Sequence, residues 1–404
     1  MNRIFLDVHA LQTVPPSNIN RDDTGAPKTA VYGGVPRARV SSQAWKRATR
    51  TYFTDQQLLE PSELGVRTKK VAEVLAERIT ALDSTLNGPE ALALAAEVIQ
   101  GATGSTIEVP QRKKSKKKAG DDDSVEETAA APTSKYLMFL SARQLDGLAQ
   151  IALDAAADVK AYFKNKENKA RAKEIADTLH SVDIALFGRM VADSADINVD
   201  AAVQVAHAIS VHRVENESDY YTAVDDENTD AEPGAGMIGT VDFNSATLYR
   251  YAALNVHQLR SNLGEGLRED EPLTTPVRRA VEAFVHGFIA SLPTGKINTF
   301  GNHTMPDAVI VKLRTTRPVS FASVFEEPVR GEDGGYVKDA CERLAQYVPS
   351  VERAYGDEDS TQTWVLRVGA STEKLAGLGE EIPSLTTLVA SVGRAVADHV
   401  EQGG

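Results

Sequence analysis

The chain has a single cysteine, Cys341, among its 404 residues. One thiol cannot form an internal disulfide, so the fold depends on its core and not on covalent staples. Long hydrophobic runs are also missing, since no apolar segment approaches the roughly 20 residues that a membrane-spanning helix needs. The first residues, MNRIFLDVHALQ, lack the basic region and apolar core of a secretion signal. We therefore expect a cytoplasmic protein with no membrane partner.

An excess of basic residues is missing too. The chain has 44 lysines and arginines against 57 aspartates and glutamates, a formal net charge of −13. This balance argues against a protein that holds nucleic acid through its overall charge. The local charge differs, because residues 37–50, RARVSSQAWKRATR, contain five basic side chains and no carboxylate. The segment predicts a local anion-binding site in an otherwise acidic protein.

Hydrophobic residues make up 42% of the chain, which is enough for a sizeable core. Residues 4–11 (IFLDVHAL), 245–259 and 307–314 (DAVIVKLR) have the apolar density or the alternation of strands, and residues 275–293 have the period of an amphipathic helix. Strands that alternate with helices predict an α+β core of the ferredoxin-like or RNA-recognition type.

Residues 60–187 have a different composition, rich in Ala, Leu, Glu and Lys at helical spacing. We expect a helical insertion here. It is interrupted at about 105–133, where the basic run 112–118 adjoins the acidic run 121–127 and large apolar residues are almost absent. This composition predicts a disordered loop whose opposite charges cancel much of each other's field.

The basic segment itself contains a predicted strand and helix. Arg37 and Arg39 lie two residues apart in an extended stretch, which places them on one face. Ser41 or Ser42 is then expected to cap a helix. In that helix one face packs, and Lys46 and the neighbouring basic residues lie on another.

Two further segments contain candidate contacts. Gly188 ends an apolar run with a bend, after which Arg189 can reach a phosphate and Met190 can wedge against a base. The alternative is that Met190 is buried. In residues 201–244, Tyr220 and Tyr221 can stack on bases, a contact worth roughly 1–3 kcal/mol per base; the alternative is cross-strand packing.

Seven short blocks of the sequence are informative together: NRDD (20–23), GG (33–34), RARVSSQAWKRATR (37–50), DIALFGRM (183–190), AHAI (206–209), DYYTAVDD (219–226) and FNSATLYRYA (243–252). Their order resembles that of the CasC family, the backbone subunits of type I-E Cascade. The chain resembles this family over most of its length, and several blocks in order are more specific than any one. The charged stretch near 105–133 is the main departure.

The resemblance implies an RNA-recognition-like palm with inserted helical fingers and a β-hairpin thumb. The expected parts are the palm (1–59 and 243–404), the fingers (60–187), an RNA-contacting bend (188–200) and the thumb (201–242). Copies of such a subunit stack along a guide RNA, and each thumb displaces bases at regular intervals.

The resemblance also implies which residues contact RNA. The expected RNA-binding residues are Asn20, Arg21, Lys28, Arg37, Arg39, Ser41, Gln43, Lys46, Arg47, Arg50, Gly188, Arg189 and Met190. Of these, Asn20, Arg21 and Lys28 can contact either the guide or the target. The expected base-displacing residues of the thumb are Tyr220, Tyr221, Thr222 and Val224. Arg21 has a local alternative, an ion pair with Asp22 or Asp23.

The expected partners also follow from the resemblance. They are crRNA, copies of the same chain, target DNA, and the large, small, CasD and repeat-processing endoribonuclease subunits of type I-E Cascade. A recruited helicase-nuclease acts on the complex. No catalytic residue, metal or cofactor is expected.

Two other classes of function stay open. Asp22 and Asp23 could hold a divalent metal and cut RNA, although adjacent carboxylates in a loop more often stabilise turns, and the eight histidines are scattered. A generic single-strand RNA-binding module is the second alternative, because the basic segment alone would allow it.

Overall fold

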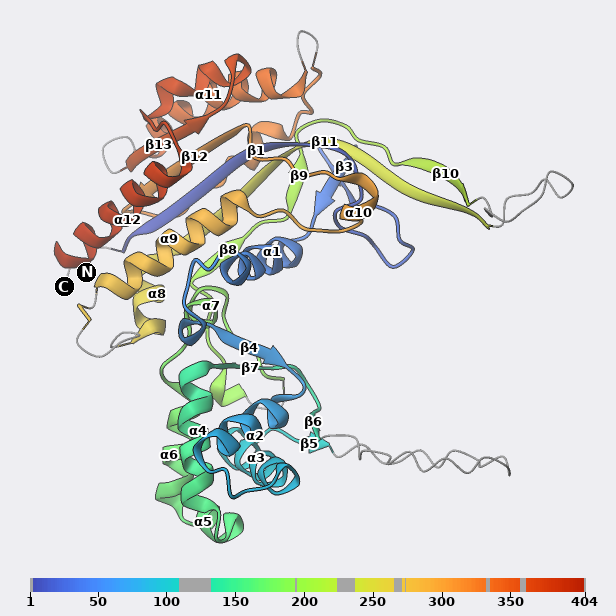
Figure 1. The fold of residues 1–404 in the computed structure, drawn as a ribbon. Coiled ribbons are helices and arrows are strands. Elements are labelled where there is room, and N and C mark those ends of the chain that lie inside the picture. Colours follow the sequence, from blue (N-terminus) through green and yellow to red (C-terminus); the bar gives the residue numbers. More distant parts are fainter. Residues whose placement is uncertain are drawn as a thin grey trace, which may run out of the picture. The chain divides into compact units, whose positions relative to one another are not determined.

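The fold of the chain is described by a computed structural model (Figure 1). The structure describes residues 3–108, 132–192, 195–223, 237–264, 271–272, 274–331, 335–356 and 361–402. Val224 and most of the charged stretch near 105–133 lie outside this part. The chain divides into two compact units. The first comprises Met1–Leu58, Val203–His257 and Val277–Gly404, and the second comprises Leu59–Ala202 and Gln258–Pro276.

A large sheet organises the first unit. At its centre, strand β1 (Phe5–Ser17) pairs antiparallel with β11 (Met237–Asn255) on one side and with β12 (Ala308–Arg314) on the other. Every residue of β12 is buried, which explains its nearly continuous apolar sequence. The order of the described strands is β14 (Glu380–Glu381), β13 (Thr361–Arg367), β12, β1, β11, β9 (Ala208–Ser210), β3 (Val35–Val40) and β2 (Thr29–Tyr32), while β8 (Val203–Val205) and β10 (Glu217–Ala223) pair with β11.

Helices cover both faces of this sheet. Leu11 and Val14 of β1 lie three residues apart, so their side chains point to opposite faces. Leu11 belongs to the core beneath α11, and Val14 belongs to the core around Trp45 of α1. The helical elements of the unit are α1 (Ser42–Asp55), α8 (Val256–Leu263, in part), α9 (Thr274–Ala290, in large part), α10 (Ile297–Phe300), η3 (Ala322–Phe325), α11 (Tyr336–Tyr355), η5 (Ala370–Leu378) and α12 (Leu385–Gln402).

A two-stranded ribbon is part of the same unit. Strand β10 pairs antiparallel with the first residues of β11, from Glu217↔Phe243 to Ala223↔Met237. Figure 1 shows this ribbon extending away from the large sheet. The β11 strand is much longer than a typical strand, because its first residues pair in the ribbon and its later residues pair in the large sheet.

The second unit is mainly helical. Two of its helices begin with capping boxes, in which Asn87 pairs with Glu90 and Ser141 pairs with Gln144. Its core consists of small and branched apolar side chains, such as Leu75. Most of these side chains come from α2, α3, α4 and α6, which pack together. The elements are η1 (Pro61–Glu63), β4 (Gly65–Thr68), α2 (Val71–Leu82), α3 (Gly88–Thr103), β5 (Ile107–Glu108), β6 (Thr133–Ser134), β7 (Met138–Ser141), α4 (Ala142–Ala155), α5 (Val159–Lys164), α6 (Lys166–Asp177), α7 (Val182–Phe187) and η2 (Ala195–Ile197).

The predicted α+β class is confirmed, and the predicted strands and the helix near 275–293 are present. The strand predicted over 245–259 is too long at its end, because residues 256–259 belong to α8. No helix in the described part of the chain has the length and apolarity that crossing a membrane would require.

Candidate nucleic-acid interface

The basic segment, residues 37–50, forms the end of β3, which pairs with β2 in a hairpin, and the first part of α1. The loop before the hairpin is attached to this segment. Ser41 caps α1, since its Oγ accepts a hydrogen bond from the N–H of Ala44 at 3.3 Å. The N–H of Ser41 in turn donates to Oδ1 of Asn20 at 2.8 Å. Asn20 therefore fixes the start of the helix to the preceding loop.

The two faces of α1 have different roles. Its buried residues are Trp45, Thr49 and Phe53. Gln43 and Arg47 are exposed, whereas Lys46 and Arg50 are half-buried. Partial burial lowers the pKa of Lys46. The first turn of α1 contains no carboxylate, so no acidic side chain there offsets the positive end of the helix dipole.

Arg37 is placed differently from the expectation. Its side chain is fully buried, and its guanidinium donates to the carbonyl oxygens of Ser210 at 2.9 Å and Phe325 at 2.8 Å. It also donates to the carbonyl oxygen of Tyr32 at 3.2 Å. These bonds join the hairpin to the segment around η3. The guanidinium of Arg37 thus binds carbonyl oxygens inside the first unit, and we leave this residue out of the proposed RNA contacts.

Arg39 keeps part of its guanidinium available. Its Nε donates to the carbonyl oxygen of Thr29 at 3.1 Å, and its Nη1 lies 3.0 Å from Nδ1 of His207. The N–H of Arg39 donates to the carbonyl oxygen of Lys28 at 2.9 Å, so the two basic residues are neighbours across the hairpin edge. Both Arg39 and Lys28 are half-buried. The structure therefore brings these two expected contacts together.

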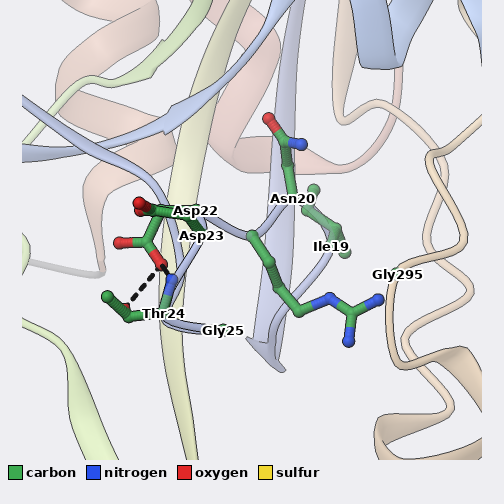
Figure 2. A pocket seen from close by; sticks show the side chains of 8 residues that line it. Ile19, Asn20, Asp22, Asp23, Thr24, Gly25 and Gly295 are labelled. Carbon is green, nitrogen blue, oxygen red and sulfur yellow. Dashed lines mark hydrogen bonds between the residues drawn. The ribbon is translucent and has the colours of Figure 1, made fainter.

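The loop that contains Arg21, Asp22 and Asp23 borders an open cavity of about 550 Å³, which is lined by residues 19–25 and Gly295 (Figure 2). Asp22 Oδ1 accepts hydrogen bonds from the N–H and the hydroxyl of Thr24, at 2.9 and 2.7 Å. These bonds, the hydroxyl first, lower the pKa of Asp22. The carboxylate thus stabilises its own turn.

A metal site at this loop would need more ligands than the two adjacent carboxylates. Among the residues that the structure describes, no group of three or more His, Cys, Asp or Glu side chains is placed to hold a metal ion.

The ribbon presents aromatic and apolar side chains. Tyr220 is 61% exposed and Tyr221 is 43% exposed, and the two neighbours point to opposite faces of the ribbon. Tyr221 pairs with Gly239, and its ring occupies the space that a Cβ at Gly239 would need. Tyr221 therefore combines exposure with cross-strand packing. Thr222 is exposed opposite Ile238, which is 60% exposed.

The segment Gly188–Met190 lies in the second unit. Gly188 adopts a φ of +77°, and a Cβ there would lie 2.7 Å from the carbonyl oxygen of Val199, so the bend requires glycine. Arg189 is buried and pairs with Asp177 at 3.0 Å. Burial lowers its pKa to about 10. Arg189 therefore stabilises its own unit, and we omit it from the proposed contacts too.

Met190 is 82% exposed, so the alternative of a buried methionine is wrong. The exposed Ile238 and the histidine that contacts Arg39 were missed from the sequence. The AHAI block contains His207, but only its position in space shows the contact with Arg39.

The fold is shared with solved structures. A chain of a structure described as "CRISPR RNA-guided surveillance complex, pre-nicking" is 34% identical, with a TM-score of 0.79, and the match covers 97% of this chain and 100% of that chain. A chain of a "CRISPR RNA-guided surveillance complex" is 31% identical, with a TM-score of 0.68, and the match covers 97% of this chain and 99% of that chain. A comparison with curated proteins finds no match.

In class, this is an α+β protein with the fold of chains from CRISPR RNA-guided surveillance complexes. The chain belongs to the family of CT1975-like proteins, whose model matches residues 6–391. The resemblance to CasC proteins, based on the seven sequence blocks, is thereby confirmed.

Proposed function

We propose that the chain is a non-catalytic guide-RNA-binding backbone subunit of a type I-E Cascade complex in antiviral defence. The carrying observation is that four cations of the first unit stay at least partly exposed although the whole chain has a net charge of −13. They are Lys28 and Arg39 at the β2–β3 hairpin and Lys46 and Arg47 on α1, and together they define the proposed basic surface. Cations placed by a hairpin and a helix bind phosphates without reading bases, as a scaffold for guides of any sequence requires. The membership of the family supports the same proposal.

The other expected RNA contacts also belong to the proposal. In the first unit they are Asn20, Arg21, Ser41, Gln43 and Arg50. The second unit contributes its own contacts, Gly188 and Met190, separately from the basic surface. The first unit is the proposed RNA-recognition-like palm, the helices of the second are the proposed fingers, and the β10–β11 ribbon is the proposed thumb. Tyr220, the more exposed of the two described tyrosines of the ribbon, is the proposed base-displacing residue.

The proposed partners are crRNA, further copies of the chain, target DNA and the other Cascade subunits, in the cytoplasm. Stacked copies would hold the guide so that the segments between displaced bases stay free to pair. Cleavage of the target would then come from the recruited helicase-nuclease.

The competing proposal is RNA cleavage at the Asp22 loop. The hydrogen bonds that Asp22 accepts from Thr24 support a role in the turn. The scaffold reading therefore has the better physical support.

The test is co-expression of the chain with the other complex subunits and a CRISPR array, followed by mapping of the bound RNA. Wild-type chains should give periodically protected guide RNA. The double variant Lys46→Ala/Arg47→Ala should lose this protection, and its RNA affinity should fall less steeply with salt, by about 0.7 in slope for each lost phosphate contact. A matched control, Lys374→Ala/Arg394→Ala, removes two exposed charges from η5 and α12 and should bind like wild type.

Equal protection in the two double variants would show that the basic surface does not hold RNA. Magnesium-dependent cutting of RNA that disappears in Asp22→Ala or Asp23→Ala would replace the scaffold proposal with the nuclease proposal.

A further inference from the structure

His207 lies next to the proposed RNA surface and has no assigned role. It stands in the short connection between β8 and β9, and the pairing of Arg39 with Ile209 brings this connection beside β3. Its Nδ1 lies 3.0 Å from Nη1 of Arg39. The guanidinium is held at a second point by the bond from its Nε to the carbonyl oxygen of Thr29. Arg39 is thus oriented by the hairpin and by the histidine.

The contact defines the protonation state of the imidazole. An arginine has donors only, so Nδ1 of His207 must be the acceptor and the ring is neutral, with its proton on Nε2. His207 itself is exposed. In the described part of the chain, Nε2 of His207, Nη2 of Arg39 and Nζ of Lys28 donate to no protein group, which leaves donors from all three residues for a ligand.

In the described part of the chain, the two charges that act on His207 are both positive. Burial lowers the pKa of His207, and the charges of Arg39 on β3 and Lys28 on the segment before β2 lower it further. A ligand with negative charge at this point would offset both cations and favour the imidazolium, which could then also attract the ligand by charge.

We propose that Lys28, Arg39 and His207 form one phosphate site, in which His207 takes up a proton when a phosphate of an RNA backbone binds. The inference rests on the proposed RNA-binding function and adds its regulation by pH. In the free chain the neutral ring orients Arg39. In the complex the protonated ring no longer accepts the hydrogen bond from Arg39. The imidazolium of His207 and the guanidinium of Arg39 then both contact the phosphate.

The sign of the pH dependence follows from linkage. Binding raises the pKa of His207 from its lowered value, so the complex holds more protons than the free components between the two pKa values. RNA affinity must therefore rise as the pH falls through this interval, by up to about tenfold for each pKa unit that separates the two states. Well above the higher pKa, the pH has no effect through His207.

The test measures binding of the full chain to a fluorescent single-stranded RNA oligonucleotide at constant ionic strength, between about pH 8 and pH 5.5. His207→Asn keeps an acceptor for Arg39 but cannot take up a proton. We expect wild-type affinity to rise about three- to tenfold over this range. The variant should bind about two- to threefold more weakly at pH 8, because it lacks the Nε2 donor, and should not gain affinity on acidification. His257→Asn, an exposed histidine at the start of α8, is the control and should follow wild type.

A second measurement is the proton uptake itself. Calorimetric titrations of the same RNA in two buffers of different ionisation enthalpy should show protons taken up by wild type near pH 6.5 and fewer by His207→Asn. An equal gain in affinity and equal proton uptake in the two chains would overturn the phosphate site proposed for His207. Absence of RNA binding by wild type at pH 8 would instead contradict the proposed function.

Discussion

Asp7 and Arg314 form an ion pair in the interior of the first unit, with Nε of Arg314 2.9 Å from Oδ2 of Asp7 and both side chains fully buried. The carboxylate also accepts hydrogen bonds from the hydroxyl of Tyr251 and the N–H of Val319, each at 2.9 Å. Arg314 reaches a second carboxylate, Glu352, at 3.0 Å. The network therefore connects β1, β11 and β12 with α11.

Loss of one partner of this pair should destabilise the first unit. We expect Asp7→Ala to lower the free energy of unfolding by about 3 kcal/mol, because a buried guanidinium loses its closest counter-charge. Urea denaturation followed by tryptophan fluorescence measures this, since both tryptophans, Trp45 and Trp364, lie in the first unit. Unchanged stability of Asp7→Ala would mean that the pair does not hold the sheet together.

The intact ion pair contributes less to the free energy of unfolding than the removal of one partner costs. Burial raises the pKa of Asp7 to about 6, although the bonds from Val319, Arg314 and Tyr251 oppose this shift. The charged carboxylate thus carries a desolvation cost that its partners only partly offset. The double variant Asp7→Leu/Arg314→Met should accordingly be closer to wild type than Asp7→Ala is, and it serves as the control in the same denaturation series.

The second unit should lose stability in mild acid. Nε2 of Gln144 donates to Nδ1 of His180 at 3.0 Å, which requires a neutral ring. Burial, and then the charge of Arg189, lowers the pKa of His180 from 6.5 to about 4. The pKa of His180 in the folded chain lies below its value in the unfolded chain. The contribution of the neutral ring to the free energy of unfolding is therefore complete above pH 6.5 and is lost as the pH falls from 6.5 to about 4. The total loss is at most about 3 kcal/mol.

Hydrogen exchange of α4 and α7 can measure this loss. Protection of the two helices, corrected for intrinsic exchange, should fall between about pH 7 and pH 5. His180→Asn keeps an acceptor for Gln144 and should show a flatter dependence. The prediction fails if the variant and wild type lose protection equally.

Local structure was easier to predict from the sequence than the contacts of individual charged side chains. Apolar periodicity located β1, β12 and α9, and the serine before the basic helix was correctly expected as its cap. Alternation also placed Arg37 and Arg39 on one face. It could not show that the carbonyl oxygens of Phe325 and Glu326 bind Arg37, because this contact joins segments almost 300 positions apart. Among the described residues, Arg39 has no such contact and stays half-buried.

Long-range contacts explain the other differences as well. Arg189 follows a bend that the sequence indicated through Gly188, but its ion pair with Asp177 depends on how α6 packs beside the bend. His207 becomes relevant only through the pairing of β9 with β3. The candidate site was thus predictable as a segment, whereas the division between structural and available cations required the fold.

Substitution of the first of the two glycines in the turn between β2 and β3 should destabilise the first unit more than substitution of the second. Gly33 and Gly34 both have positive φ, +60° and +76°. A Cβ at Gly33 would lie 1.6 Å from the carbonyl oxygen of Glu326, whereas one at Gly34 would meet no atom within 4 Å. Gly34→Ala should therefore cost about 1–2 kcal/mol from backbone strain alone. Gly33→Ala should cost clearly more, because it also separates the hairpin from η3.

Thermal unfolding of the two variants tests this difference, and RNA binding tests its consequence. Gly33→Ala should have the lower Tm and the weaker affinity, since the hairpin orients Arg39. Equal Tm values would show that the close contact with Glu326 does not fix the hairpin.

The ribbon offers a test of base displacement that separates its two tyrosines. Tyr220 is the more exposed ring, and Tyr221 packs over Gly239, so truncation of Tyr220 should leave the ribbon folded. In assembled complexes whose guide carries 2-aminopurine at the displaced positions, Tyr220→Ala should let the displaced base return to stack on its neighbouring bases, which lowers its fluorescence. The lost contact between the base and the tyrosine ring should cost about 1–3 kcal/mol. Tyr220→Phe keeps the ring and should resemble wild type, because stacking needs the aromatic face and not the hydroxyl. If phenylalanine and alanine at this position gave the same loss, the hydroxyl and not the ring would be the contact, and the ribbon would have to act on the guide through hydrogen bonding.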